Sequence, residues 1–281
     1  MIQDVKLKKQ PNILITGVSG YIGRKLLYQI EYMNLVGIKF SSKYDFGNQN
    51  VITADLTDRN QVNDIFNKYK PGVVYHFAAL TSPVVNEEKI EIARLSHLGI
   101  TQNILDNISS DAHIIFLSTD KVFDGTNPCP DEEAPTNPLW VYGKFKKLCE
   151  DMIKERIHKY HVLRLPIVHS LGDSDSGSFI DQALIRLKEQ KSVKAFDNVF
   201  RCYVLLSDLM NLLEKLMYDD HYGVYHVGTK MMSYYDRLKL LCVKNNIDYK
   251  NLLQPVKGQA KPMKQNLNTQ KIKLILNFYF R

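Results

Sequence analysis

The stretch Asn12-Ile-Leu-Ile-Thr-Gly-Val-Ser-Gly-Tyr-Ile-Gly-Arg24 decides the fold of this chain. It opens with an apolar run that is typical of a buried strand and continues into three glycines at three-residue spacing. Behind the glycines, Leu26, Leu27 and Ile30 recur at helical spacing. A strand, a glycine turn and a helix in this order predict a dinucleotide-binding unit.

Each glycine of this turn has its own physical role. Gly17 makes the tight turn, Gly20 lets the backbone approach a pyrophosphate, and Gly23 lets the helix pack on the sheet. The N-terminus of the helix then offers free N–H groups to the phosphates. We expect the cofactor to be held here by Gly17, Ser19, Gly20, Tyr21, Ile22, Gly23 and Arg24.

The second predicted strand, residues 35–40, bears on the choice of cofactor. NAD-binding folds usually carry a carboxylate near the end of this strand, whereas here the run is Lys39-Phe-Ser-Ser-Lys43. Together with Arg24, Ser41 and Lys43 could receive a 2′-phosphate, so we expect NADPH, with NADH as the alternative. The opposing interpretation is that residues 41–50 form a polar loop in which Asp45 takes the acidic role.

Strands and helices alternate through the first 170 residues. Further strands are predicted at 51–56, 73–79 and 113–119, with helices capped at Thr57 or Asp58 and over 86–107. This rhythm predicts an α/β fold, a Rossmann-type doubly wound parallel sheet with ligands at the carboxyl ends of its strands and a small C-terminal substrate-binding lobe. The expected organisation is a tail at 1–10, an NAD(P)-binding Rossmann domain at 11–170 to which the chain returns at about 200–228, and a mainly substrate-binding lobe at 171–281.

Tyr142 and Lys146 are the candidate chemical groups. Asn137 and Pro138 predict a helix start, and residues four apart on a helix share one face. A nearby ammonium favours the phenolate and makes the phenol a better proton donor, although such a pair also occurs by chance on exposed helices. Thr119 ends the strand at 113–119, where its hydroxyl could bind a substrate oxygen or cap the next turn.

Composition excludes several other classes of protein. The chain has 281 residues and a formal charge of +7, but its lysines are dispersed among acidic residues, so we expect no nucleic-acid partner. No apolar run is long enough to span a bilayer, so we expect a cytoplasmic protein without a membrane partner. The four cysteines are widely separated, and Asp173 and Asp175 lack further ligands at calcium-loop spacing, so we expect no metal.

The chain resembles the extended short-chain dehydrogenase/reductase family and, within it, the dTDP-4-dehydrorhamnose reductases. The glycine motif is the variant found in short-chain dehydrogenases, and the likeness covers nearly the whole chain from residue 11. The carrying motifs are Thr16-Gly-Val-Ser-Gly-Tyr-Ile-Gly23, Asp55-Leu-Thr-Asp58, His76-Phe-Ala-Ala79, Ser118-Thr-Asp-Lys-Val-Phe-Asp-Gly125 and Pro138-Leu-Trp-Val-Tyr-Gly-Lys-Phe-Lys146.

The resemblance implies a reductase of a nucleotide-linked 4-keto-6-deoxyhexose. Thr119, Tyr142 and Lys146 would form the catalytic triad, in which Tyr142 protonates the alkoxide and Lys146 binds the nicotinamide ribose. Positions next to the cofactor would be Asp55, Leu56, Ala78 and Ala79, in addition to Tyr142 and Lys146. Candidate substrate contacts are Thr81, Ser118, Lys121, Arg201 and Tyr203. We expect a nucleotide sugar as partner and a homodimer as a candidate assembly.

Two features depart from the family pattern. Lys121 stands where the family usually has tyrosine, next to the expected sugar, so the sugar could differ from rhamnose. The pair Asp120-Lys121 is not the Asp-Glu pair of the sugar-nucleotide dehydratases, which disfavours dehydration.

Two other functions stay open at this point. The regulatory β subunit of methionine adenosyltransferase is similar in fold and motifs, including a run that matches Phe123 to Pro128, so a non-catalytic NADP-binding subunit is one alternative. The other is a bifunctional epimerase and reductase with Cys129 or His169 as acid/base groups, although a buried thiol and an incidental histidine are the simpler interpretations.

Overall fold

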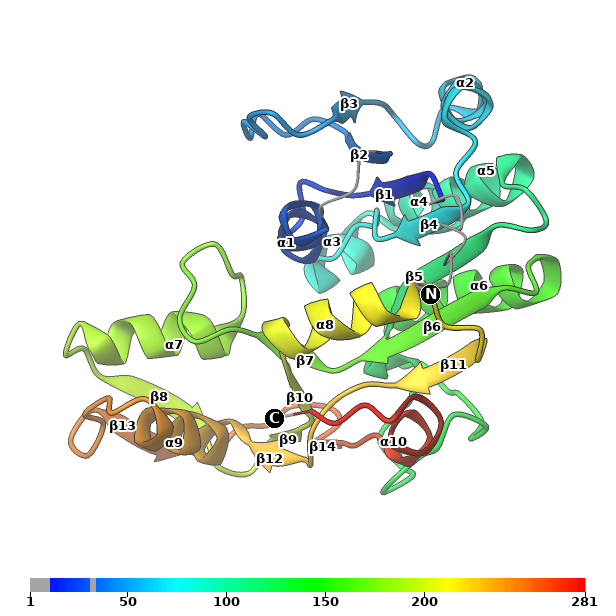
Figure 1. The fold of residues 1–281 in the computed structure, drawn as a ribbon. Coiled ribbons are helices and arrows are strands. Elements are labelled where there is room, and N and C mark those ends of the chain that lie inside the picture. Colours follow the sequence, from blue (N-terminus) through cyan, green and yellow to red (C-terminus); the bar gives the residue numbers. More distant parts are fainter. Residues whose placement is uncertain (1–10, 31–33, 281) are drawn as a thin grey trace, which may run out of the picture.

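The computed structural model describes residues 11–30 and 34–280. The predicted tail at 1–10 lies outside this range. A seven-stranded sheet runs through the centre, with the strand order β11-β6-β5-β4-β1-β2-β3 and every neighbouring pair parallel (Figure 1). Its strands are β1 (Ile13–Thr16), β2 (Leu35–Lys39), β3 (Val51–Thr53), β4 (Val73–His76), β5 (His113–Thr119), β6 (Tyr160–Leu165) and β11 (Gly223–His226).

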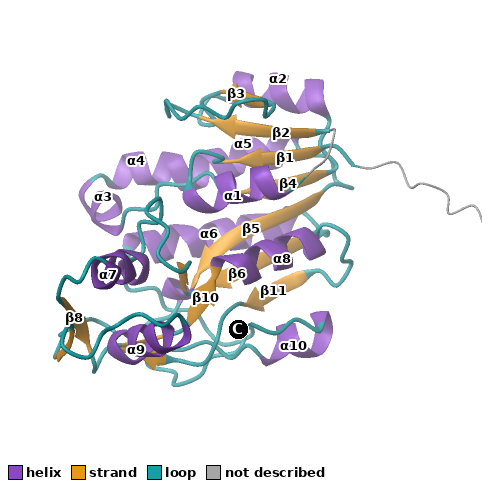
Figure 2. Cartoon of the chain, turned by 60° about the vertical axis from the view of Figure 1, so that its left-hand side comes forward, coloured by secondary structure: helices purple, strands orange, loops and turns teal. Residues whose placement is uncertain are grey.

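Helices cover both faces of the sheet (Figure 2). One hydrophobic cluster joins α1 (Tyr21–Gln29), α8 (Leu206–Leu216) and α10 (Gln270–Leu276) to one face. A second cluster joins α2 (Arg59–Tyr69), α5 (Ile100–Asn107) and α6 (Val141–Arg156) to the other. Strands buried on both faces are the expected consequence of this three-layer arrangement, and β1, β4 and β5 are buried at every residue. The predicted doubly wound sheet is confirmed.

The long helix predicted over residues 86–107 is interrupted. The chain forms α3 (Pro83–Glu88), α4 (Ile90–Arg94), a π-helical turn at Leu95–Gly99 and then α5. The π turn brings the buried His97 to a place where its Nε2 lies 3.1 Å from both the Leu80 carbonyl oxygen and Asn86 Oδ1. Because these contacts join His97 to the beginning of the segment and to the loop before it, helical periodicity gave no sign of the break.

The remaining elements follow β6 and build a smaller lobe with its own hydrophobic cluster, at the lower left in Figure 2. Its strands pair in small groups, β10 with β7, β13 with β8, and β9 between β12 and β14. The elements are β7 (Ile167–His169), α7 (Phe179–Lys188), β8 (Val193–Phe196), β9 (Phe200–Arg201), β10 (Tyr203–Leu205), β12 (Met232–Ser233), α9 (Tyr234–Lys244), β13 (Leu253–Val256) and β14 (Lys264–Gln265). No helix in the described part of the chain is long and apolar enough to cross a membrane.

Candidate functional site

The glycine turn has the geometry of an anion cradle. Gly17 adopts φ +71°, and a Cβ there would lie 2.8 Å from the backbone nitrogen of Ala78. A Cβ on Gly23 would lie 2.4 Å from the Gly17 carbonyl oxygen, so the helix packs this close only with glycine. The N-cap of α1, Gly20, provides no side-chain hydrogen bond, and the first turn contains no acidic residue. The first N–H groups of α1 are therefore available to a phosphate.

A cavity of about 470 Å³ lies on one side of this turn, at the carboxyl ends of β1, β2, β3 and β4. The structure brings six of the predicted cofactor residues together here. They are Gly17, Ser19, Asp55, Leu56, Ala78 and Ala79. Asp55 turns its carboxylate toward its own loop, because Oδ1 accepts hydrogen bonds from the backbone N–H and the hydroxyl of Thr57.

The cation at this cavity is not one of those predicted. Lys39 and Phe40 line it, whereas Ser41 and Lys43 are exposed and do not. β2 ends at Lys39, one residue before the predicted end of the strand at Phe40, so the ligand side of the sheet begins earlier than the sequence interpretation assumed. Lys39 could have been identified as the last residue of this strand, because ligands bind at the carboxyl ends of parallel strands.

Arg24 is also turned away from the cavity. Its guanidinium lies 3.1 Å from Asp175 Oδ2 and stacks over the Tyr44 ring at 4.6 Å. The neighbouring Lys25 lies 2.7 Å from Asp173 Oδ2. The acidic loop that contains Asp173 and Asp175 is thus joined by ion pairs to the helix that follows the glycine turn.

A second cavity, of about 290 Å³, lies on the other side of the glycine turn and contains the three predicted catalytic residues. Thr119 comes from the end of β5, and Tyr142 and Lys146 come from the first turns of α6. The wall also includes the predicted residues Gly17, Gly20, Tyr21, Ile22, Gly23, Thr81 and Ser118. Gly17 lines both cavities, so they adjoin at the glycine turn, and together they are called the groove.

The start of α6 differs from the prediction. Asn137 does not cap the helix, because its side chain donates to Asp124 at 2.8 Å and the helix begins at Val141. The N–H of Val141 instead donates to Glu87 Oε1 at 2.7 Å. This carboxylate of α3 takes the capping role, a tertiary contact that local sequence does not reveal.

Lys146 is a buried ammonium with a fixed direction. Its side chain is 3% exposed, and Nζ donates to the Leu117 carbonyl oxygen at 2.8 Å and lies over the Phe116 ring at 4.5 Å. Burial lowers the pKa of Lys146 to about 8. Burial also raises the pKa of the Tyr142 phenol above its ordinary value, and the nearby Asp120 raises it further.

The His97 ring packs against the Tyr142 ring. Its ring meets that of Tyr142 edge to face, with centroids 5.6 Å apart. Both partners of Nε2 are acceptors, so this nitrogen carries the proton. Burial and the neighbouring Lys146 lower the pKa of His97 to about 3, which keeps the ring neutral.

A third cavity, of about 410 Å³, opens toward the smaller lobe. It shares Thr81, Thr119, Tyr142 and Pro166 with the second cavity. The predicted substrate contacts Lys121 and Arg201 line it. Other residues that line it were not predicted as substrate contacts, namely Asp120, Phe123, Trp140, Ile167, Tyr234, Lys261, Pro262 and Gln265.

The charges of this third cavity are held in place. Arg201 donates to the carbonyl oxygens of Phe200, Pro262 and Met263 at 2.7 to 3.2 Å. Burial raises the pKa of Asp120 to about 6, although the charges of Lys121 and Arg201 act in the opposite direction. A cavity with this lining can accept a ligand that carries both negative charge and hydroxyl groups.

Comparison with known proteins places this geometry in a family. The chain matches the model of the RmlD substrate binding domain over residues 11–276. It belongs to that family. Methionine adenosyltransferase 2 subunit beta of Rattus norvegicus is 28% identical over 278 residues, covering 94% of this chain and 82% of the relative. The spore coat polysaccharide biosynthesis protein SpsK of Bacillus subtilis is 26% identical and covers 80% and 76%, respectively.

Among solved structures, the dTDP-4-dehydrorhamnose reductase of Bacillus anthracis, in complex with NADP, superimposes with a TM-score of 0.80. The superposition covers 96% of this chain and 93% of the reductase chain, and the two sequences are 22% identical. This similarity shows that the two proteins share a fold. The chain therefore has the extended short-chain dehydrogenase/reductase fold of this family.

Two predicted substrate residues have other partners in this member of the family. Tyr203 lines none of the three cavities; its side chain is fully buried in the cluster of the smaller lobe. Arg201 ends β9 and Tyr203 begins β10, so the two residues belong to different strands and only Arg201 reaches the third cavity. Ser118 lines the second cavity, yet its hydroxyl donates to the buried carboxylate of Glu150.

The candidate epimerase groups lie outside the groove. Cys129 is exposed, contrary to the simpler interpretation of a buried thiol, and lines a separate cavity near α10. His169 is buried, with Nδ1 2.6 Å from the Ser170 carbonyl oxygen and Nε2 2.7 Å from the Arg237 guanidinium. Neither lines the cavities that contain Tyr142.

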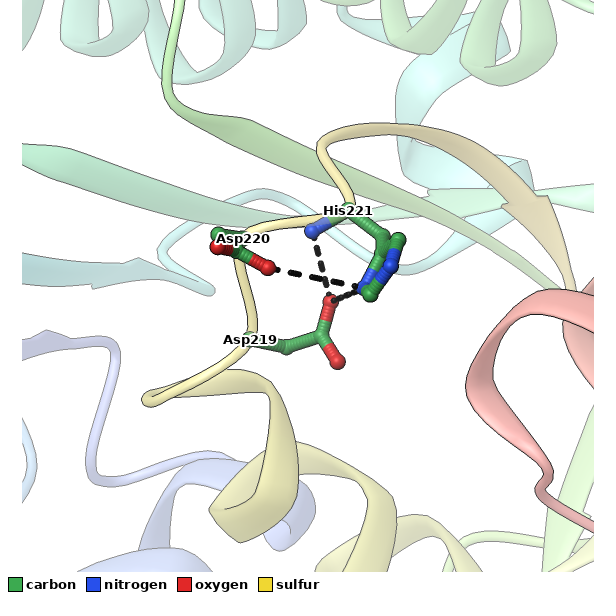
Figure 3. Close-up of side chains that lie close together, drawn as sticks. All are labelled: Asp219, Asp220 and His221. Carbon is green, nitrogen blue, oxygen red and sulfur yellow. Dashed lines mark hydrogen bonds and ion pairs between the residues drawn. The ribbon is translucent and has the colours of Figure 1, made fainter.

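Three residues of types that can bind a metal ion lie just before β11, at the end of the sheet away from the cavities. Figure 3 shows the side chains of Asp219, Asp220 and His221, which lie between α8 and β11. One possible ligand atom of each residue lies within 4.8 Å of the others. Asp219 Oδ1 already accepts hydrogen bonds from the backbone and the ring of His221, at 2.8 and 3.2 Å. These contacts hold a local turn.

Proposed function

We propose that the protein is an NAD(P)H-dependent reductase of a nucleotide-linked 4-keto-6-deoxyhexose in deoxysugar and polysaccharide biosynthesis. One observation carries the proposal: Thr119, Tyr142 and Lys146 line a cavity that joins the glycine groove on one side and the charged third cavity on the other. A proton donor between a dinucleotide site and a sugar-nucleotide site is the arrangement that carbonyl reduction needs.

The groove fits NADPH. The uncapped start of α1 faces a diphosphate, and the small Ala78 and Ala79 leave room for the dinucleotide against the backbone. Lys39 offers a cation to a 2′-phosphate, with NADH as the alternative cofactor. The similar reductase of Bacillus anthracis was crystallised with NADP. The bound reduced nicotinamide supplies a hydride to the C4 carbonyl of the sugar.

Tyr142 would protonate the oxygen at C4. As the carbonyl carbon is reduced, the O–H bond of the phenol breaks and an O–H bond forms on the sugar, leaving a phenolate. The buried ammonium of Lys146 favours that phenolate, and the Thr119 hydroxyl can donate to the same sugar oxygen. In the structure this hydroxyl donates to Asp120 Oδ1 at a long 3.3 Å, so it can be redirected at low cost.

The third cavity would hold the sugar nucleotide. Arg201 has a fixed guanidinium at its wall, and Lys261 adds a second cation, which suits a diphosphate. Thr81 and Lys121 lie nearer to Tyr142, where the sugar ring would sit.

A direct assay tests this function. The purified protein is mixed with NADPH and either a dTDP-linked or a UDP-linked 4-keto-6-deoxyhexose, and the loss of NADPH absorbance is followed, with the Tyr142→Phe variant as control. We expect oxidation with at least one nucleotide and a loss of more than 100-fold in the variant. No oxidation with either substrate would refute the proposal.

A second candidate function is supported by the similarity to methionine adenosyltransferase 2 subunit beta. In that case the protein would bind NADP and a synthetase subunit without catalysis. Copurification with a synthetase, together with synthetase rates that do not change in Tyr142→Phe, would favour it. A bifunctional epimerase would instead incorporate deuterium from the solvent at C3 or C5 of the product.

A further inference from the structure

Lys121 reaches Tyr142 from the side of the third cavity. Its ammonium lies 5.6 Å from the centroid of the Tyr142 ring, within the range of a cation–π contact. Lys146 lines the second cavity and not the third, whereas Lys121 lines the third and not the second. The Lys121 ammonium therefore lies on the third-cavity side of the Tyr142 ring, whereas Lys146 belongs to the second cavity.

The backbone fixes this arrangement. The N–H of Lys121 donates to Thr119 Oγ1 at 3.2 Å in the turn that follows β5. The carbonyl oxygen of Lys121 would lie only 2.2 Å from a Cβ on Gly143, the residue after Tyr142. Glycine at this position lets the Lys121 turn pack directly on the first turn of α6. The two side chains are thus held at neighbouring backbone positions.

We propose that Lys121 is a positioning residue of the reduction site, whose ammonium holds the Tyr142 ring from the substrate side and stabilises the phenolate left after proton transfer. This inference rests on the proposed function, because only a phenol that gives up its proton leaves such a phenolate. In the step concerned, the phenol O–H bond breaks and an O–H bond forms on the sugar, while the hydride donor becomes oxidised. The cation at Lys121 takes no proton in this step.

Several other charged or titratable groups surround the Tyr142 phenol, and their effects have to be separated from that of Lys121. Asp120 faces Tyr142 and disfavours the phenolate, and Cys149 does so if it ionises. Lys146 lies one turn further along the same helix, and His97 is neutral. Lys121 is flanked by Asp120, so it could instead serve only as the counter-charge of that carboxylate. The experiment has to separate these two roles.

A fluorine NMR titration makes the separation. 3,5-Difluorotyrosine, whose phenol is more acidic than that of tyrosine, is placed at position 142, and its ionisation is followed against pH in the full chain. We expect Lys121→Met to raise the phenol pKa by about one pH unit, since an opposite charge at this distance shifts a pKa by roughly that amount or more. Lys121→Arg should restore most of the shift.

Two matched variants complete the test. Lys144→Met removes an exposed lysine two residues from Tyr142 that lines neither cavity, and it should leave the titration unchanged. In an Asp120→Asn background, Lys121→Met should still raise the phenol pKa by a similar amount. A shift that disappears in that background, or none in the single variant, would overturn the proposal and leave Lys121 as a counter-charge.

The titration needs neither cofactor nor substrate. A wild-type protein that oxidises no NADPH would therefore refute the proposed function without deciding the role of Lys121. Where the wild type is active, the alkaline limb of the pH profile for sugar reduction should move upward in Lys121→Met, while Lys144→Met keeps the wild-type profile. A change confined to KM would indicate that Lys121 contacts the sugar alone.

Discussion

The ammonium of Lys146 donates to the Leu117 carbonyl oxygen at 2.8 Å, two residues before Thr119 at the end of the same strand. This hydrogen bond directs a buried cation toward the cavity that contains Tyr142. The position is costly for a charge, because burial lowers the pKa of Lys146 to about 8 from its ordinary value of 10.5. We infer that function, and not stability, keeps a lysine at this position.

Replacing Lys146 should therefore separate activity from stability. The folded pKa lies below the unfolded one, so the cost of the buried charge is present in full below about pH 8 and is relieved as the pH rises toward 10.5. At pH 7, Lys146→Met should raise the free energy of unfolding by roughly 1 to 3 kcal/mol and lower the reductase rate at least about 100-fold. Urea unfolding and NADPH oxidation measure the two effects. The exposed Lys144→Met should change neither, and a destabilised Lys146→Met protein would contradict this account.

Cofactor choice should depend on Lys39 rather than Lys43. Lys39 lines the cavity at the end of β2, and Lys43 is exposed outside it. Lys39→Ala should weaken NADPH binding about tenfold and NADH binding far less, because only NADPH carries the 2′-phosphate. Lys43→Ala is the matched control and should leave both affinities unchanged. Fluorescence titration of each cofactor gives the ratio, and equal losses for NADPH and NADH in Lys39→Ala would reject a role in recognising the phosphate.

His97 should act by orienting the phenol. Its ring packs against Tyr142, and its Nε2–H is held by Leu80 and Asn86. His97→Leu removes the hydrogen bonds that fix the ring and should lower kcat about tenfold with little change in KM, because a small displacement of the proton donor is costly. His97→Asn, which keeps a donor, should recover part of the loss. An increase in KM alone would show that the residue affects substrate binding instead.

The parts of the site that sequence predicted are those that depend on local chemistry. The glycine turn was readable because only glycine tolerates φ +71° at Gly17 and the close approach at Gly23. Tyr142 and Lys146 were readable because residues four apart share a helix face. Their partner Thr119 followed from the rule that ligands gather at the carboxyl ends of parallel strands.

The parts that sequence missed depend on contacts between distant segments. The capping of α6 by Glu87 and the π turn around His97 arise from side chains of neighbouring helices and loops. Lys261 and Gln265 line the third cavity although they lie more than 100 residues after Tyr142 in the sequence. A local sequence pattern does not predict which residues of such a distant segment reach the site. Lys39 was missed for a smaller reason, an error of one residue at a strand end.

Acid should unfold the protein through its buried histidines. Burial lowers the pKa of six of them to about 3 or 4, namely His76, His97, His113, His161, His169 and His226. The folded values lie below the unfolded value of about 6.5, so stability is complete above that pH and is lost as the pH falls toward 4. Asp120 and Glu132 have the opposite effect, since burial raises the folded pKa of each carboxyl group, to about 6 for Asp120, but they are two groups against six.

Each such histidine contributes about 1.4 kcal/mol per pH unit below 6.5, so we expect cooperative unfolding before about pH 4.5. Urea unfolding at a series of pH values measures the slope. His113→Gln should reduce the slope by one proton, whereas His158→Gln, at an exposed position, should not change it. A free energy of unfolding that stays flat between pH 6.5 and 5 would exclude this explanation.

The acidic loop should compete with the cofactor for the cations of α1. Asp175 pairs with Arg24 and Asp173 with Lys25, directly after the glycine turn that faces the diphosphate. Removing both carboxylates, in an Asp173→Asn/Asp175→Asn variant, should free two positive charges and tighten NADPH binding several-fold at low salt, with the gain shrinking as salt screens the charges. Asp197→Asn, which breaks a similar ion pair with Lys257 in the smaller lobe, is the control. Weaker NADPH binding in the double variant would mean that the loop helps to build the cofactor site, since loss of its anchors would then disorder a wall that the cofactor needs.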